Sequence, residues 1–81
     1  MKVYWIIPSN PPEVLVDAWH TLQDSYGTEH FTLHQATEIL SKDFTNLMTP
    51  GNLARTQERI LNLLENYEHQ GALASTEETN G

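Results

Sequence analysis

The sequence predicts a small α+β fold, in which a three-helix core packs on a β-sheet of two or three strands. Three observations lead to this prediction. The chain opens with a β-branched and aromatic run, three later segments repeat apolar residues at helical spacing, and Gly71 separates the last of these from a short apolar run. The length of 81 residues fits one domain, which we place at residues 1–74. Residues 75–81 are acidic, lack bulky apolar side chains and are predicted to be disordered.

The opening run, residues 2–7, predicts a β-strand bounded by Pro8. Because side chains alternate along a strand, Val3, Trp5 and Ile7 share one face. Both faces are largely apolar, which favours a strand buried in the domain's own sheet. The alternative is contact with a partner or with a second copy through Val3, Trp5 and Ile7, including a dimer that exchanges residues 2–7.

The first helical segment covers residues 11–26 and follows a proline-rich break. The Asn10 side chain is placed to cap this helix, and Pro11 suits its first position. Gly27 is a natural end. The apolar positions at helical spacing are Leu15, Ala18, Trp19, Leu22 and Tyr26.

The second helical segment covers residues 33–41 and begins with a capping box. Thr32 is the predicted N-cap, and Gln35 stands three residues later. Its buried stripe is predicted to consist of Leu33, Ala36, Ile39 and Leu40. Residues 41–48 are turn-like and are expected to anchor to the core through Phe44, Leu47 and Met48.

The third helical segment, residues 49–69, is the longest. Thr49 is placed to cap it and Pro50 to occupy its first position, although Gly51 disfavours helix and makes a start at Asn52 the alternative. At about 100° per residue, one side packs on the core. That side carries Leu53, Thr56, Ile60, Leu63, Leu64 and Tyr67. The opposite side carries Arg55, Arg59, Asn62, Asn66 and His69, without an acid.

The charge balance limits the partners that the chain can bind. Eleven Asp and Glu residues against four Lys and Arg give a formal net charge of −7. Since nucleic-acid affinity rests largely on Lys and Arg contacts to phosphates, this balance disfavours non-specific nucleic-acid binding and suits a basic protein partner. The chain has no cysteine and no apolar run near the ~20 residues that span a bilayer, so we expect a cytoplasmic protein without a membrane partner.

No residue pattern indicates catalysis, a metal or a cofactor. The motif G-x-S-x-G is absent, and the glycines are isolated, so neither a nucleophile elbow nor a phosphate-binding loop is predicted. His20 and Asp24 share a helical face, but two ligands make a weak metal site. We predict a protein that is not an enzyme and that uses no cofactor, metal or small-molecule substrate.

The end of the third helical segment resembles the recognition helix of winged-helix DNA-binding domains, in which a helix with apolar anchors stops at a glycine and turns into a strand. The residues that carry this resemblance are Ile60, Leu64, Tyr67, Gly71 and Leu73. Residues 31–40 look like the short strand and second helix of the same fold. Together with the first helix, the resemblance covers about residues 11–74.

The resemblance implies a DNA-binding protein, such as a small transcriptional regulator, that acts as a dimer and contacts DNA through helix 49–69. The DNA-binding candidates that it implies are Arg55, Thr56, Arg59, Asn62 and Lys42. Among these, Thr56 also belongs to the side that is predicted to pack on the core.

The chain departs from the winged-helix pattern in two places. Residues 41–48 are longer than the family's tight turn, and only residues 75–81 remain to build the wing. The N-terminal strand is expected to complete the sheet in the wing's place. The alternative fold is a three-helix bundle with a flanking strand. The alternative function is a protein–protein interaction module, an adaptor or a small inhibitor, that uses the acidic surface and the N-terminal strand.

Overall fold

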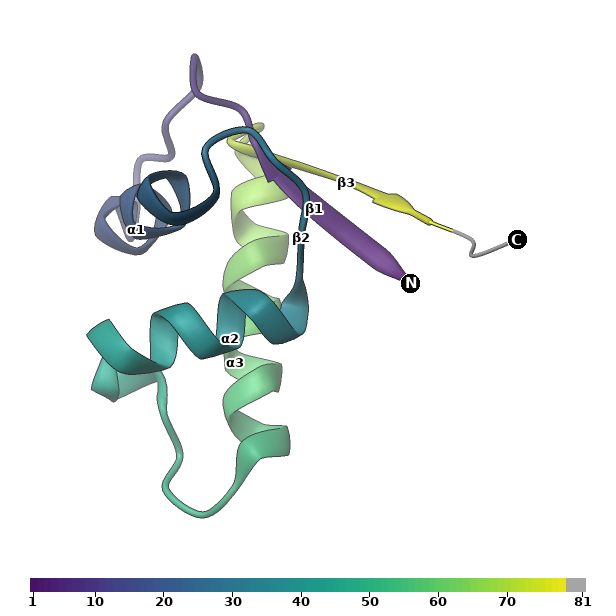
Figure 1. Cartoon of the computed structure of the whole chain (residues 1–81). Helices are drawn as coiled ribbons and strands as arrows, with labels where there is room; N and C mark the ends of the chain where they lie inside the picture. The colour runs from purple at the N-terminus through teal and green to yellow at the C-terminus, as the bar shows by residue number, and fades with distance from the viewer. Residues whose placement is uncertain (79–81) are drawn as a thin grey trace.

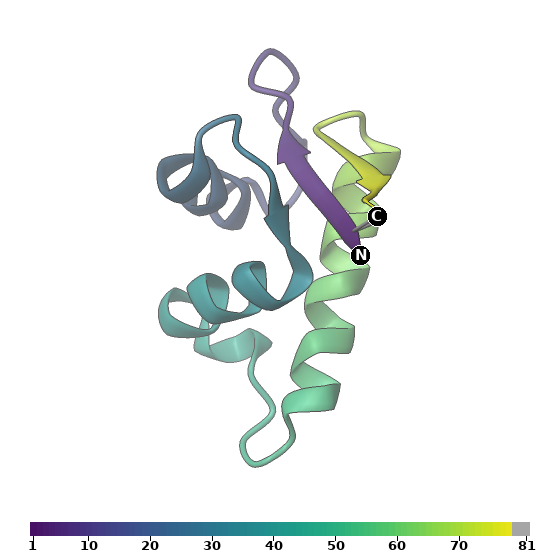
Figure 2. The same cartoon turned by 45° about the vertical axis from the view of Figure 1, so that its right-hand side comes forward.

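The computed structural model describes residues 1–78 and has the predicted α+β architecture (Figure 1). Its elements are β1 (Lys2–Ile6), α1 (Val16–Tyr26), β2 (Phe31–Thr32), α2 (Leu33–Asp43), the short 3-10 helix η1 (Thr45–Leu47), α3 (Leu53–His69) and β3 (Leu73–Glu77). The helix α2 crosses the middle of α3, and the sheet lies beside the C-terminal half of α3 (Figures 1 and 2).

The N-terminal strand is the central strand of the sheet. The strand order is β2-β1-β3, and both neighbours of β1 are antiparallel to it. Tyr4 is opposite Phe31 on one side and opposite Ser75 on the other. The prediction that residues 2–7 belong to the domain's own sheet is therefore confirmed.

The strand β3 extends further than the sequence predicted. Residues 75–77 were expected to be disordered, but they pair with β1 and belong to the strand. Their composition gives no sign of order, because the pairing uses backbone groups. The Met1 amino group adds an ion pair with Glu77 at 2.9 Å. Residues 79–81 of the predicted tail lie outside the described part of the chain.

The core lies between the helical face of the sheet and the three helices. Its largest fully buried side chains are Trp19, Tyr4, Tyr67, Phe31, Ile6, Leu22, Leu40, Ile60 and Leu64. The Trp19 indole N–H donates to the Ala72 carbonyl at 2.9 Å, and the Tyr67 hydroxyl donates to the Leu15 carbonyl. These two bonds satisfy the polar atoms of the two largest aromatic residues of the helices and tie α1 to the C-terminal end of α3.

The first helix begins at Val16, five residues later than the predicted start at residue 11. The expected cap, Asn10, donates instead to the Gln70 carbonyl at 3.2 Å, and the Glu13 N–H donates to the Gln70 side chain at 2.7 Å. The N-cap position is held by Leu15, which has a left-handed φ of 54° and no side-chain cap. Its side chain is 59% exposed, so the prediction that Leu15 belongs to the buried stripe is wrong.

The second helix has the predicted capping box. The Gln35 N–H donates to the Thr32 hydroxyl at 3.2 Å, and the Thr32 N–H donates to the Gln35 side chain at 2.9 Å. The helix runs two residues beyond its predicted end, to Asp43. In the segment that follows, Phe44 and Leu47 pack on the core as expected. Met48 is exposed, which corrects the prediction that it anchors the loop.

Candidate nucleic-acid interface

The candidate interface is the outward face of the N-terminal half of α3. The first turns of this helix, with the loop that leads into them, extend beyond α2 in both views of the molecule (Figures 1 and 2). The helix begins at Leu53, and its N-cap is Asn52, whose side chain accepts the Arg55 N–H at 3.0 Å. The alternative start at Asn52 is thus closer to the structure than a start at Thr49.

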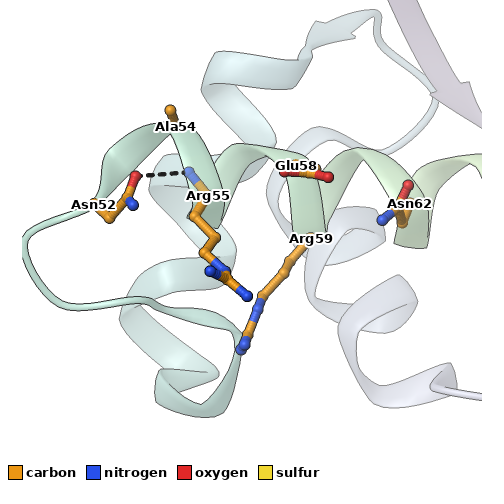
Figure 3. Close-up of a pocket in the computed structure, with 6 residues that line it drawn as sticks. All are labelled: Asn52, Ala54, Arg55, Glu58, Arg59 and Asn62. Atoms are coloured by element: carbon orange, nitrogen blue, oxygen red, sulfur yellow. Dashed lines mark hydrogen bonds between the residues drawn. The ribbon is translucent and has the colours of Figure 1, made fainter.

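Three of the predicted DNA-binding residues share one exposed surface. Arg55, Arg59 and Asn62 line a shallow depression of about 400 Å³ on α3 (Figure 3). The other residues that line it are Asn52, Ala54 and Glu58. We call these six residues the α3 surface. Asn52 and Ala54 were not among the predicted site residues, although Asn52 stands three residues before Arg55 and Ala54 four before Glu58, the spacings of neighbours on a helix.

The two arginine side chains extend toward the same side of α3 (Figure 3). One guanidinium N–H of Arg59 donates to the Asn46 carbonyl at 3.3 Å, which links the helix to the preceding η1 segment. A guanidinium has five N–H donors, so this bond uses a small part of the capacity of Arg59. The η1 segment therefore positions Arg59 without consuming its ability to bind an anion.

One carboxylate lies within this surface. The side of the helix opposite the core was predicted to carry no acid, but Glu58 lines the same depression as the two arginines. Two arginines and one glutamate give the α3 surface a formal charge of +1. No ion pair joins Glu58 to Arg55 or Arg59 within residues 1–78. The surface is thus positive in a chain of net charge −7, but by one unit only.

Thr56 does not belong to this surface. It is 3% exposed, its hydroxyl accepts the Thr49 N–H at 2.8 Å, and the hydroxyl donates to the Asn52 carbonyl at 3.2 Å. These bonds close the loop that precedes α3. The structure therefore removes Thr56 from the DNA-contacting set, in agreement with its place among the core-packing residues of the helix.

The predicted burial of Leu53, in the same part of the helix, is wrong. It was predicted to pack on the core, but it is 62% exposed because it lies in the first turn of α3, beyond α2.

Lys42 is exposed in the last turn of α2 and is not among the residues that line the depression. The structure therefore does not join Lys42 to the arginine pair.

The candidate partner-contact residues of β1 lie on the face of the sheet that the helices leave open. Val3 is 5% exposed, whereas Trp5 and Ile7 are partly buried. The Trp5 ring stacks on the His30 ring with 4.8 Å between centroids, and His30 Nδ1 lies 3.1 Å from a Glu78 carboxylate oxygen. This group covers part of the open face and leaves the edges of Trp5 and Ile7 accessible.

The described residues were also considered for a metal site and for a membrane-spanning helix. Residues 1–78 contain no group of three or more His, Asp or Glu side chains placed to hold a metal ion. Within the same range, the helices are too short or too polar to traverse a lipid bilayer.

Comparison of the chain with family models, curated proteins and solved structures gives no match. What the fold and the site define is a small α+β domain that presents an arginine-bearing helix face to solvent.

Proposed function

We propose that this chain is a winged-helix-like DNA-binding protein, a small transcriptional regulator, that places the N-terminal half of α3 in the major groove of DNA. The observation that carries the proposal is the α3 surface, where Arg55, Arg59 and Asn62 are exposed together on one face of the helix. The rest of the helix is held by the core through Ile60, Leu64 and Tyr67.

The side chains of the α3 surface can form hydrogen bonds with the edges of DNA bases. Arginine donates two hydrogen bonds to guanine, and asparagine pairs with adenine in the same groove. At about 1.5 Å per residue, Arg55 and Asn62 are roughly 10 Å apart along the helix, or about three base pairs. An α-helix fits the width of the major groove, so one helix is expected to contact a short half-site.

The fold supports the proposal through the order of its elements. Three helices with a strand between the first two, and a further strand after the third, follow the winged-helix pattern. The strand β1 takes the central position in the sheet. Because no hairpin follows β3 within residues 1–78, DNA contacts by a wing are not part of this proposal.

Two arginines provide only part of the affinity that a regulator needs, so the proposal includes a dimer that binds two half-sites. Each phosphate contact contributes about −0.9 to the slope of log K against log salt concentration. When each arginine cation in the groove is counted as one neutralised phosphate charge, two per chain give a slope of about −1.8, which is about a twelvefold loss of affinity between 50 and 200 mM salt. Two chains give about −3.6 and a loss of about 150-fold.

The test is fluorescence anisotropy with a labelled duplex of randomised sequence at several salt concentrations. Arg55→Ala and Arg59→Ala are each expected to reduce the salt slope by about 1, and Arg→Lys at either position to preserve the slope, because it keeps the charge and removes only the two-pronged donor group. Ser25→Asp is the matched control, because it changes the net charge by the same amount on the exposed end of α1. Equal effects of Ser25→Asp and the arginine variants would show that only total charge matters.

A second candidate function is a non-enzymatic protein–protein interaction module, an adaptor or a small inhibitor. The observation that favours it is the open face of β1, where Trp5 and Ile7 remain partly exposed in a chain of net charge −7. It is tested by Trp5 fluorescence together with amide shifts on addition of candidate proteins from the host. Shifts at Trp5 and Ile7 without shifts on α3 favour this function over DNA binding.

A further inference from the structure

The strand β3 forms an edge of the sheet and is hydrogen-bonded on one side only. The strand order β2-β1-β3 gives it β1 as its neighbour, and Figure 2 shows it on the side of β1 that faces away from β2. An exposed edge strand is a template on which another extended segment can pair. Such pairing requires backbone N–H and C=O groups of β3 that are not already bonded to β1.

The register with β1 determines which backbone groups of β3 remain unbonded. The Ile7 N–H donates to the Ala72 carbonyl at 3.1 Å, and the Glu78 N–H donates to the Met1 carbonyl at 2.8 Å. Because backbone groups alternate in direction along an antiparallel strand, Ala74 and Thr76 also face β1. The backbone N–H and C=O groups of Leu73, Ser75 and Glu77 therefore point outward, and no backbone hydrogen bond to them is found within residues 1–78.

A carboxylate lies next to these outward groups. The Ser75 hydroxyl donates to one oxygen of Glu68 at 2.9 Å, which places the Glu68 side chain beside the middle of β3. The other oxygen is shielded from solvent and has no hydrogen-bond partner within residues 1–78. Lys2 Nζ forms an ion pair with this oxygen at 3.8 Å, a distance longer than a hydrogen bond.

Glu68 also opens onto a surface depression. Together with Glu65, Lys2 and His69 it lines a hollow of about 390 Å³ on the helical side of the sheet edge. The hollow holds two carboxylates, Glu65 and Glu68, against one ammonium, Lys2, so with His69 neutral it keeps a net negative charge that attracts a cationic side chain. Glu68 connects this hollow to the strand, because it also accepts the hydroxyl of Ser75 in the middle of β3.

We propose that the outer edge of β3 binds an extended segment of a basic partner protein, which adds a fourth strand to the sheet. The backbone of this segment pairs with Leu73, Ser75 and Glu77. Because side chains alternate along a strand, every second residue faces the hollow that Glu65 and Glu68 line, and Lys or Arg is expected there. The remaining residues lie beside Ala74 and Thr76, where β-branched side chains fit.

A second copy of the chain is a poorer occupant for the same edge. Two β3 edges related by a two-fold axis would bring Glu65 and Glu68 of each copy together without a new cation. Electrostatic complementarity therefore favours a basic partner over a second copy at this edge.

The experiment uses the whole chain and a fluorescein-labelled peptide of about seven residues, the length of a typical strand, with alternating Lys and Val. A control peptide contains the same residues in two blocks, so that its charge is equal and its alternation is lost. We expect the alternating peptide to bind at least about tenfold more tightly than the block peptide. Equal affinity for the two peptides overturns the proposal, because it shows attraction by charge alone.

Variants of β3 locate the contact. Ser75→Pro removes one outward N–H and leaves the bonds to β1, so we expect about a tenfold loss of peptide affinity. Ser75→Ala is the matched control, since it keeps this N–H and removes only the bond to Glu68; we expect an effect within about threefold. If Ser75→Pro binds as tightly as Ser75→Ala, the edge is not the site.

Amide hydrogen exchange of the unmodified protein provides a result that does not depend on the variants. With the alternating peptide, the amides of Ser75 and Glu77 are expected to gain protection, while Ala74 and Thr76 stay as they were. Unchanged exchange at Ser75 and Glu77 contradicts the proposal. So does a concentration-dependent dimer, seen by sedimentation, that Ser75→Pro abolishes, because the edge would then belong to a second copy.

Discussion

The substitution Tyr67→Phe probes the bond that connects α3 to the start of α1. The Tyr67 side chain is fully buried, and its hydroxyl donates to the carbonyl of Leu15, the residue with the left-handed φ. Removal of this donor leaves a carbonyl next to an exposed segment, where water can replace part of the bond. We therefore expect a loss of about 1–1.5 kcal/mol, which lowers Tm by roughly 4–10 °C for a domain of this size.

The stability difference between the unmodified protein and Tyr67→Phe is expected to decrease as the pH rises. Burial raises the pKa of Tyr67 far above its ordinary value of 10.0. A group whose pKa is raised on folding contributes stability below its unfolded pKa and loses it as the pH rises beyond that value. Between about pH 10 and the folded pKa, the unmodified protein loses about 1.4 kcal/mol per pH unit through Tyr67, and Tyr67→Phe does not.

The assay is urea unfolding followed by far-ultraviolet circular dichroism at pH 7 and pH 11. At pH 7 the unmodified protein is expected to be the more stable one, and by pH 11 the difference should have closed or reversed. Burial also raises the pKa values of Tyr4 and Tyr26, but both residues are present in the two proteins and cancel in the comparison. Tyr26→Phe is the matched control at a partly exposed site, with an expected effect below about 0.5 kcal/mol. A stability difference that is the same at both pH values would refute the assignment of Tyr67 as a buried, neutral donor.

Three further predictions concern the fold and the surface of α3. Thr32→Ala removes the capping box of α2 and is expected to cost about 1 kcal/mol in urea unfolding, whereas Thr28→Ala in the preceding turn should be near neutral. Leu64→Ala is expected to cost about 2–5 kcal/mol and Leu53→Ala less than about 0.5 kcal/mol; comparable losses would contradict the burial described for the two residues. Thr56→Val is expected to reduce stability by about 1–2 kcal/mol, because it leaves the Thr49 N–H without its acceptor, and to leave DNA affinity per folded molecule unchanged; a selective loss of affinity would restore Thr56 to the interface.

Local patterns in the sequence were sufficient to predict the elements whose signals are themselves local. The capping box of Thr32 and Gln35, the apolar stripe from Ile60 to Tyr67, and the β-branched run of residues 2–7 all correspond to structure. In these cases the interactions that define the element lie within one turn or within one strand, so spacing alone carries the information.

The errors arise where contacts between distant segments decide the conformation. Asparagine is a common helix cap, but the Asn10 side chain donates instead to the carbonyl of Gln70, sixty residues away. Residues 75–77 look disordered by composition, and they are ordered by the backbone of β1. A single sequence contains no local trace of such partners.

The candidate site was predictable in part for the same reason. Helical spacing alone grouped Arg55, Arg59 and Asn62, because they lie on one helix face. The same spacing placed Leu53 on the core side, but it did not show that α2 crosses the middle of α3 and leaves the first turn uncovered. The contact of Arg59 with Asn46 depends on the η1 segment and has no counterpart in the helix pattern.

The most direct test of the central claim, that α3 carries a DNA-contacting surface, is titration of the ¹⁵N-labelled protein with a duplex of randomised sequence at low salt, followed residue by residue. We expect amide and side-chain shifts to concentrate at Arg55, Arg59 and Asn62, and Trp5 and Ser75 to remain unaffected. Shifts that are absent throughout the chain at low salt, or that cluster on β1 and β3 and leave α3 unchanged, would contradict it.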